Sequence, residues 1–159
     1  MMSGARPSDA AADPVEGRTV GRQVVLDTNI VLDAFVFSDP AAVPLRAGLD
    51  DGSLRWIATG AMRVELARVL GYPQITPRLA FYGLQADDVL AAFDRLSRRV
   101  DAAPKAPLTC ADRDDQIFID LAARHRCALL SKDRAVLKLR KRLLALGVRA
   151  GPRLDALPG

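Results

Sequence analysis

Residues 24–32 read Val24-Val25-Leu26-Asp27-Thr28-Asn29-Ile30-Val31-Leu32, a short apolar run that ends in a carboxylate and gives way to a second apolar run. This pattern predicts a buried strand that stops at Asp27, where the chain turns directly into a helix. In an open α/β sheet, ligands bind at the carboxyl ends of the strands. A carboxylate at that edge is costly unless a cation or a hydrogen-bond network compensates its charge.

The rest of the chain predicts an alternation of helices and strands. Apolar periodicity and turn residues predict helices over residues 30–37, 44–49, 59–70, 85–100, 114–125 and 135–146, and further strands over residues 54–58, 127–130 and 148–150. A loop is expected over residues 102–109, which contain two prolines, and Val100 could close one more strand. Strands that alternate with helices indicate an α/β fold with a parallel sheet.

Composition indicates one globular domain with a polyanionic partner. The chain has 159 residues, of which 50% are hydrophobic, and a net charge of +4. We expect residues 22–159 to form the domain and the small, polar residues 1–21 to be a disordered extension, with no signal peptide. No apolar run approaches the roughly 18–20 residues of a membrane span, so no membrane partner is expected. Two cysteines without a disulfide framework favour a cytoplasmic protein.

Glu65 is an unexpected acid within the predicted helix over residues 59–70. It follows Met62 by three residues and precedes Val69 by four, which predicts a position on the buried stripe of the helix. A carboxylate there must be paired or must bind a metal. The alternative is an ion pair with Arg68 or Arg63 at the edge of the stripe.

The run Asp112-Arg113-Asp114-Asp115 opens the next predicted helix. Acids are favoured at a helix N-terminus because of the helix dipole, which offers a purely structural explanation. Asp114 and Asp115 align equally well with the apolar residues that follow, so spacing does not choose between them. Asp120 falls on the outer face, where we expect a solvated charge.

Asp133 follows the predicted strand over residues 127–130, as Asp27 follows the first strand. It can be a helix N-cap, or it can face the same crevice as Asp27. Together with Glu65 and Asp115, these acids form an all-oxygen set that suits magnesium or manganese rather than zinc. Such a set suits hydrolysis of a phosphodiester, in which metal ions activate water and neutralise charge.

The motifs, taken in order, resemble those of the PIN-domain (PilT N-terminus) ribonucleases, in particular the VapC-like toxins of toxin–antitoxin pairs. The segments that carry the resemblance are Leu26–Asn29, Ser53–Ile57 followed by Val64–Leu66 and Val69–Leu70, Cys110–Phe118, Leu129–Asp133 and a closing segment from Gly147 to Leu154. In the third segment the family's ligand is usually the last acid before the helix, which implies Asp115. The chain departs from the pattern at Gln116, where a lysine is common.

The resemblance implies a three-layer α/β/α fold with a central, mainly parallel sheet. It implies an endoribonuclease that hydrolyses RNA with Mg²⁺ or Mn²⁺, often as a homodimer, and that a cognate antitoxin occludes in the toxin members. The implied catalytic and metal-binding residues are Asp27, Glu65, Asp115 and Asp133. Asn29 and Ser131 would hydrogen-bond a carboxylate or a water on the metal, while Asp112 and Asp114 remain alternative acids.

The predicted helix over residues 135–146 and the residue before it carry a group of cations beside the proposed site. Their charges favour contact with RNA phosphates, although a solvated helix face is an alternative explanation. These residues are Arg134, Lys138, Arg140, Lys141 and Arg142.

Other protein classes fit the sequence less well. A haloacid-dehalogenase-type phosphatase would need an aspartate where Asn29 stands, and a response-regulator receiver would need an acidic pair that is missing beside its phosphorylated aspartate. A non-catalytic PIN-like module that binds RNA or protein remains the alternative to a nuclease, and the intact acids argue against it.

Overall fold

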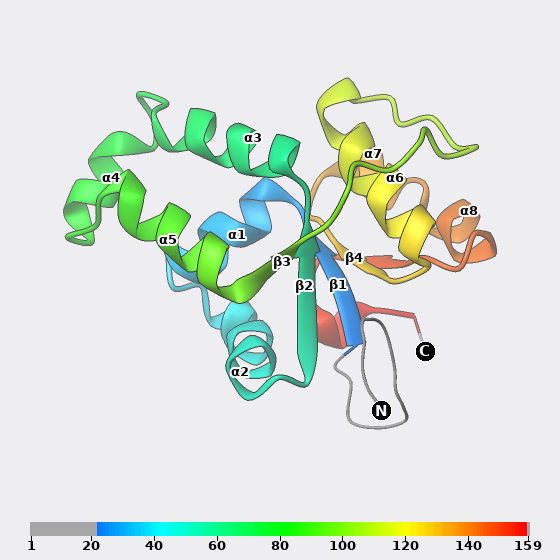
Figure 1. Cartoon of the computed structure of the whole chain (residues 1–159), viewed down its shortest axis with the longest axis horizontal. Helices are drawn as coiled ribbons and strands as arrows, with labels where there is room; N and C mark the ends of the chain where they lie inside the picture. The colour runs from blue at the N-terminus through cyan, green and yellow to red at the C-terminus, as the bar shows by residue number, and fades with distance from the viewer. Residues whose placement is uncertain (1–21, 159) are drawn as a thin grey trace, which may run out of the picture.

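Five parallel strands form the centre of the protein, in the order β3-β2-β1-β4-β5 (Figure 1). The computed structural model describes residues 22–158, so the extension expected over residues 1–21 lies outside the described residues. The strands are β1 (Arg22–Leu26), β2 (Leu54–Ala58), β3 (Ser97–Arg99), β4 (Ala128–Leu130) and β5 (Arg149–Gly151). Their pairing confirms the predicted parallel sheet.

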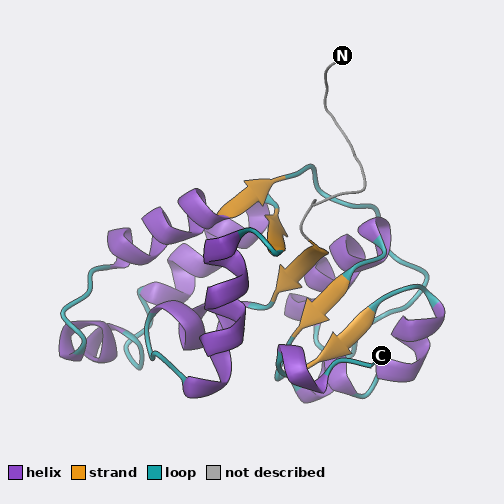
Figure 2. Cartoon of the chain, turned by 90° about the horizontal axis from the view of Figure 1, so that it is seen from below, coloured by secondary structure: helices purple, strands orange, loops and turns teal. Residues whose placement is uncertain are grey.

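Helices lie on both sides of these strands, which confirms the three-layer α/β/α arrangement (Figure 2). In Figure 1, α3, α4 and α5 lie on one side of β1 and β2, and α6 and α8 lie on the other. The α-helices are α1 (Thr28–Phe35), α2 (Val43–Asp51), α3 (Gly60–Leu70), α4 (Thr76–Phe81), α5 (Ala86–Leu96), α6 (Gln116–His125), α7 (Arg134–Leu137) and α8 (Arg140–Ala145). Three 3₁₀ turns are η1 (Pro40–Ala42), η2 (Arg113–Asp115) and η3 (Leu154–Ala156).

The core forms around the central strand β1 and its neighbour β2. Val24, Val25 and Leu26 of β1 are at most 2% exposed, as expected for a strand that is covered on both faces. On one side of the sheet, Trp56 of β2 stacks on Phe35 with ring centroids 5.9 Å apart. Strand β1, which leads to Asp27, is thus packed on both faces.

The predicted helix over residues 85–100 was too long. Helix α5 ends at Leu96, and Ser97 Oγ donates a hydrogen bond to the Phe93 carbonyl at 2.5 Å, which satisfies a carbonyl in the last turn. The chain then enters β3, which pairs with β2 and leads to Val100. Helix α4 was not expected, and no strong apolar period marks its six residues.

The single helix predicted over residues 135–146 is two short helices, α7 and α8. A tight turn separates them, in which the Leu139 amide donates to the Val136 carbonyl at 2.9 Å. The sequence has no proline or glycine at this break, so the apolar periodicity predicted one continuous helix. Among the described residues, no helix is both long and apolar enough to cross a membrane.

Candidate functional site

The carboxyl ends of β1 and β4 lie side by side and bring two polar residues together. Leu26 pairs with Leu130 in the sheet, and the Asp27 amide donates to the Leu130 carbonyl at 3.0 Å. Ser131, which follows β4, donates its amide to the Gly151 carbonyl at 3.0 Å. The register of the sheet therefore places Asp27 and Ser131 at neighbouring positions on one edge.

Asp27 is buried, with 4% of its surface exposed, and both of its carboxylate oxygens are hydrogen-bonded. Oδ1 accepts from the Asn29 amide at 3.0 Å, which makes Asp27 the N-cap of α1. Oδ2 accepts from Ser131 Oγ at 2.6 Å. Burial raises the pKa of Asp27 above its ordinary value, while these two hydrogen bonds oppose the rise. The protein thus holds this carboxylate in one orientation.

Ser131 also connects Asp27 to Asp133, the acid that follows β4. Its hydroxyl oxygen accepts from the Asp133 amide at 3.1 Å while it donates to Asp27, and the residue is fully buried. Asp133 Oδ1 accepts from the Ala135 amide at 2.8 Å, so Asp133 is the N-cap of α7 as well as a neighbour of the site. The cap and site alternatives for Asp133 therefore coexist. Asn29 is exposed, and its contact with Asp27 is made by its main-chain amide rather than by its side chain.

Asp115 is the acid with the least compensation. It is 7% exposed, and within the described part of the chain its Oδ2 atom has no hydrogen-bond partner. Burial, followed by the charges of Asp27 and Asp133, raises its pKa to about 8. Asp112, Asp115 and Asp133 each offer an oxygen within 4.8 Å of the others.

The geometry separates the alternative acids at the start of α6. Asp112 belongs to the group of three, although it is exposed, and its Oδ1 accepts from the Asp114 amide at 3.0 Å as the cap of η2. Asp114 is exposed and is not one of the three. Spacing left Asp114 and Asp115 equivalent, whereas the structure buries Asp115 among like charges.

Glu65 lies at the edge of the site rather than on the buried stripe of α3. Its side chain is 20% exposed and forms an ion pair with Arg68, which is one of the two alternatives considered from the sequence. Glu65 is not in the group of three acids. Its charge nevertheless contributes to the raised pKa of Asp27, so it faces the same region.

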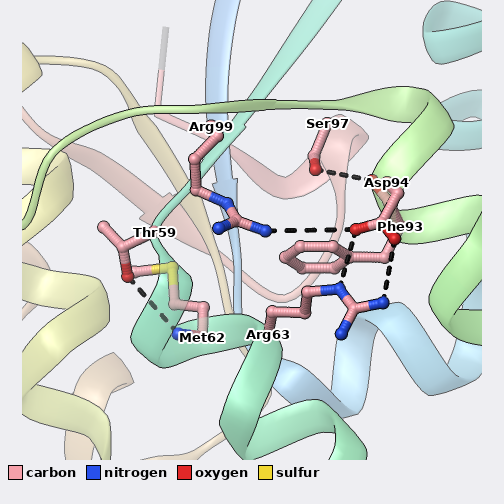
Figure 3. A network of polar contacts seen from close by, with 7 residues as sticks. All are labelled: Thr59, Met62, Arg63, Phe93, Asp94, Ser97 and Arg99. Carbon is pink, nitrogen blue, oxygen red and sulfur yellow. Dashed lines mark hydrogen bonds and ion pairs between the residues drawn. The ribbon is translucent and has the colours of Figure 1, made fainter.

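A network of ion pairs positions the helix that carries Glu65 (Figure 3). Arg63 Nε of α3 lies 2.8 Å from Asp94 Oδ1 of α5, and a second bond joins the other oxygen of Asp94 at 2.9 Å. Arg99 of β3 lies 4.0 Å from the same carboxylate. A bidentate pair of this kind fixes geometry as well as contributing energy. Arg63 is thereby occupied elsewhere and leaves Glu65 to Arg68.

Two side chains of α6 anchor the long segment that delivers Asp112, and the sequence did not identify them. Gln116 Oε1 accepts from the Cys110 amide at 2.7 Å, and its Nε2 donates to the Leu108 carbonyl at 2.9 Å. Asp120 Oδ1 accepts from the Ala106 amide at 2.9 Å. The expectation that Asp120 is a solvated surface charge was therefore wrong. Two polar side chains one turn apart, opposite a loop rich in proline, were the available signal.

The donor set fits a hard divalent cation. All the candidate ligands are carboxylate oxygens, which are the atoms that magnesium and manganese prefer. Asp115 Oδ2 is buried without a hydrogen-bond partner among residues 22–158, and burial together with the charges of Asp27 and Asp133 raises the pKa of this residue. A cation beside Asp115 would supply what the protein does not.

The five predicted RNA-contacting cations are all exposed. Arg134 lies in α7 directly after Asp133, Lys138 lies between the two helices, and the other three lie in α8. None of them takes part in an ion pair with another described residue. Their charges remain available to a partner.

Comparison with known proteins is consistent with this geometry. A family model described as the PIN domain matches residues 23–135. A solved structure with the same fold is the crystal structure of VapBC2 from Rickettsia felis bound to a DNA fragment from their promoter. That chain is 14% identical, with a TM-score of 0.54, and the alignment covers 80% of this chain and 98% of the other. No curated protein matches the sequence.

Proposed function

The chain belongs to the PIN-domain family, and we propose that it is a metal-dependent endoribonuclease that hydrolyses RNA phosphodiester bonds. The observation that carries this proposal is the buried, unpartnered Oδ2 atom of Asp115 beside the charges of Asp27 and Asp133. A buried group of like charges is expensive for a protein to maintain. Binding a cation that the reaction needs is a physical reason to keep it.

We propose that the metal is held by Asp27, Asp115 and Asp133. Two further ligands that we propose are Asp112 and, from α3, Glu65. A bound Mg²⁺ or Mn²⁺ would activate water and neutralise charge on the phosphate. Ser131 fixes the orientation of Asp27 through the 2.6 Å hydrogen bond. Gln116 holds the backbone of Leu108 and Cys110, which leads to Asp112.

The exposed cations of α7 and α8 support binding of the RNA backbone. Arg134 directly follows Asp133, so a phosphate at the acids lies close to this basic surface. Lysine and arginine contacts to phosphate supply affinity that is independent of sequence. We propose Arg134, Lys138, Arg140, Lys141 and Arg142 as this surface.

We further propose that the protein is the toxin of a toxin–antitoxin pair. Support comes from the fold it shares with VapBC2 and from the resemblance of its four acidic motifs to those of VapC-like toxins. This proposal includes an antitoxin partner, a homodimer, a cytoplasmic location and a nuclease domain over residues 22–159, preceded by a short extension.

The first experiment is cleavage of a mixed, structured RNA pool with Mn²⁺, Mg²⁺ or a chelator. Wild-type protein and Asp27→Asn are compared with the control Asp114→Asn, which changes an exposed acid outside the group of three. We expect cleavage that requires metal, that Asp27→Asn abolishes and that Asp114→Asn retains. A folded wild type that binds RNA and metal without cleaving would instead support a non-catalytic binding module.

A further inference from the structure

A hollow of about 380 Å³ opens next to the acids. Helix α1 lines it with Asn29 and Asp33, four residues apart, α4 lines it with Arg78 and the residue after the helix, Tyr82, and the segment after β4 contributes Lys132. The lining residues are Asn29, Asp33, Phe37, Asp39, Arg78, Tyr82 and Lys132. None of them belongs to the proposed metal ligands.

Chain connectivity places this hollow beside the proposed reaction site. Asn29 lies two residues after Asp27 and donates its amide to the Asp27 carboxylate. Lys132 lies between Ser131 and Asp133. A strand whose phosphate sits at the acids therefore has a neighbouring nucleotide within reach of the hollow.

The hollow presents flat surfaces suited to a planar ligand. The Arg78 guanidinium lies over the Phe37 ring, with Cζ 3.7 Å from the ring centroid. Tyr82 is 41% exposed and packs against Phe81 with ring centroids 5.1 Å apart. Unpaired RNA bases stack on aromatic rings and on arginine planes in this way.

The hollow also contains hydrogen-bond acceptors. Lys132 Nζ lies 2.5 Å from Asp33 Oδ2, so this carboxylate is already neutralised. Asp39 Oδ1 accepts from the Ala41 amide, and Asp39 has no ion pair with any described residue. Asp39 therefore offers acceptor capacity to a ligand with adjacent N–H donors.

We propose that this hollow is a base-recognition subsite that binds an unpaired guanine next to the scissile phosphate. This inference rests on the proposed nuclease function and names part of its substrate. The Watson–Crick edge of guanine presents two adjacent N–H donors that complement a carboxylate, whereas that of uracil presents a single N–H flanked by two carbonyl oxygens that repel one.

The test measures the binding of 12-nucleotide uridine RNAs that carry guanosine, inosine or uridine at the centre. Fluorescence anisotropy is recorded in chelator, so that nothing is cleaved. The guanosine RNA should bind roughly tenfold tighter than the uridine RNA, with inosine between them because it lacks the exocyclic amino group. Equal affinities, or no binding of any of the three, would overturn the inference.

Variants assign the preference to the hollow. Asp39→Asn keeps an oxygen that can cap η1, and it should abolish discrimination between guanosine and uridine. Tyr82→Ala should weaken all three RNAs by a similar factor of roughly tenfold, because stacking tolerates any base. Val43→Ala is the control, since Val43 is 61% exposed and lies outside the hollow. A guanosine preference that survives Asp39→Asn would contradict the proposal.

The outcomes separate this inference from the nuclease proposal. Guanosine preference without cleavage of any RNA would refute the nuclease alone, and cleavage without base preference would refute the subsite alone. If Asp39→Asn and Tyr82→Ala instead disrupt a complex with a partner protein and leave RNA binding unchanged, the hollow is a protein contact and the inference fails.

Discussion

Asp27 and Asp115 are two carboxylates buried to nearly the same degree at one edge of the sheet, with 4% and 7% of their surfaces exposed. Both oxygens of Asp27 accept hydrogen bonds, whereas one oxygen of Asp115 has no described partner. The difference shows that burial alone does not identify a ligand site. Hydrogen bonds compensate part of the charge of Asp27, whose pKa burial still raises, whereas compensation for Asp115 must come from a proton or a cation.

The cause of this difference lies in the local backbone. Asp27 stands between a strand and a helix, where the α1 amides and the neighbouring strand's Ser131 supply donors. Asp115 directly precedes α6, but as the last residue of η2 it has helical backbone angles (φ −87°, ψ −12°) rather than the extended ones of Asp27, and its side chain makes no cap hydrogen bond. The cluster thus contains one acid fixed in advance and one left unsatisfied.

The largest expected effect comes from neutralising each acid in turn. Asp27→Asn and Asp115→Asn should each reduce metal-dependent cleavage about a thousandfold, on the order of the loss of a key electrostatic group. Their effects on the metal-free fold should have opposite signs. Asp115→Asn removes a buried carboxyl that must bind a proton as the chain folds, so it should raise the free energy of unfolding. Asp27→Asn replaces one of two hydrogen-bonded oxygens by an NH2 group, so it should lower the free energy of unfolding by about 1–3 kcal/mol.

Urea denaturation of both variants in chelator measures these signs, with Asp114→Asn as the control. If the free energy of unfolding changes in the same direction in Asp27→Asn and Asp115→Asn, the two carboxylates do not differ in how well the protein compensates them.

A second expectation concerns pH. Because the folded pKa of Asp115 is raised to about 8, the folded state binds a proton that the unfolded state releases near pH 4. Stability of the metal-free protein should therefore fall as pH rises through this range, by about 2 kcal/mol between pH 6 and pH 8. Urea denaturation at several pH values in chelator measures this slope. Asp115→Asn should flatten it, and a slope unchanged in that variant would place the titration elsewhere.

The sequence predicted the sheet and both strand-end acids because these depend on local pattern. The apolar runs that end at Leu26 and Leu130 fit only strands that are buried on both faces. Because adjacent parallel strands end at the same edge of the sheet, the residues that follow them lie close together. The strand over residues 54–58 was predicted with the bounds of β2 for the same reason.

Helical spacing gave Arg68 and Arg63 as alternative partners of Glu65 without deciding between them, and it did not predict the contacts of Asp120 and Gln116. Spacing assigns a face but not a partner, and the partners come from elsewhere: Asp94 of α5 occupies Arg63, and the loop backbone occupies Gln116 and Asp120. Helical spacing also left Asp114 and Asp115 equivalent, because a 3₁₀ turn precedes α6 and shifts the phase of its first residues; only the resemblance to the family pointed to Asp115.

A smaller effect is expected from Ser131→Ala. The variant removes the hydrogen bond to Asp27 Oδ2 and the acceptor for the Asp133 amide inside a fully buried position. The free energy of unfolding should fall by about 1–2 kcal/mol. Cleavage should fall less than in Asp27→Asn, because the carboxylate remains. Denaturation and cleavage rates measure both effects against Ser53→Ala, which changes an exposed serine, and wild-type stability in Ser131→Ala would show that Asp27 is not held by the hydroxyl.

The smallest effect is expected from Arg68→Ala. This variant tests whether the protein holds Glu65 in place, as it holds Asp27, or leaves it free to bind the metal, as it leaves Asp115. Arg68 is 56% exposed, so loss of its pair with Glu65 should leave stability unchanged within error. If Glu65 turns toward the metal, the cation competes with Arg68 for its oxygens. Affinity for Mn²⁺, measured by titration calorimetry, should then rise by a few fold, on the order of one surface ion pair.

Arg63→Ala, which instead releases α3 from Asp94, should lower the affinity for Mn²⁺. A fall in Mn²⁺ affinity in Arg68→Ala would show that the pair holds Glu65 in place for the metal, as Ser131 holds Asp27.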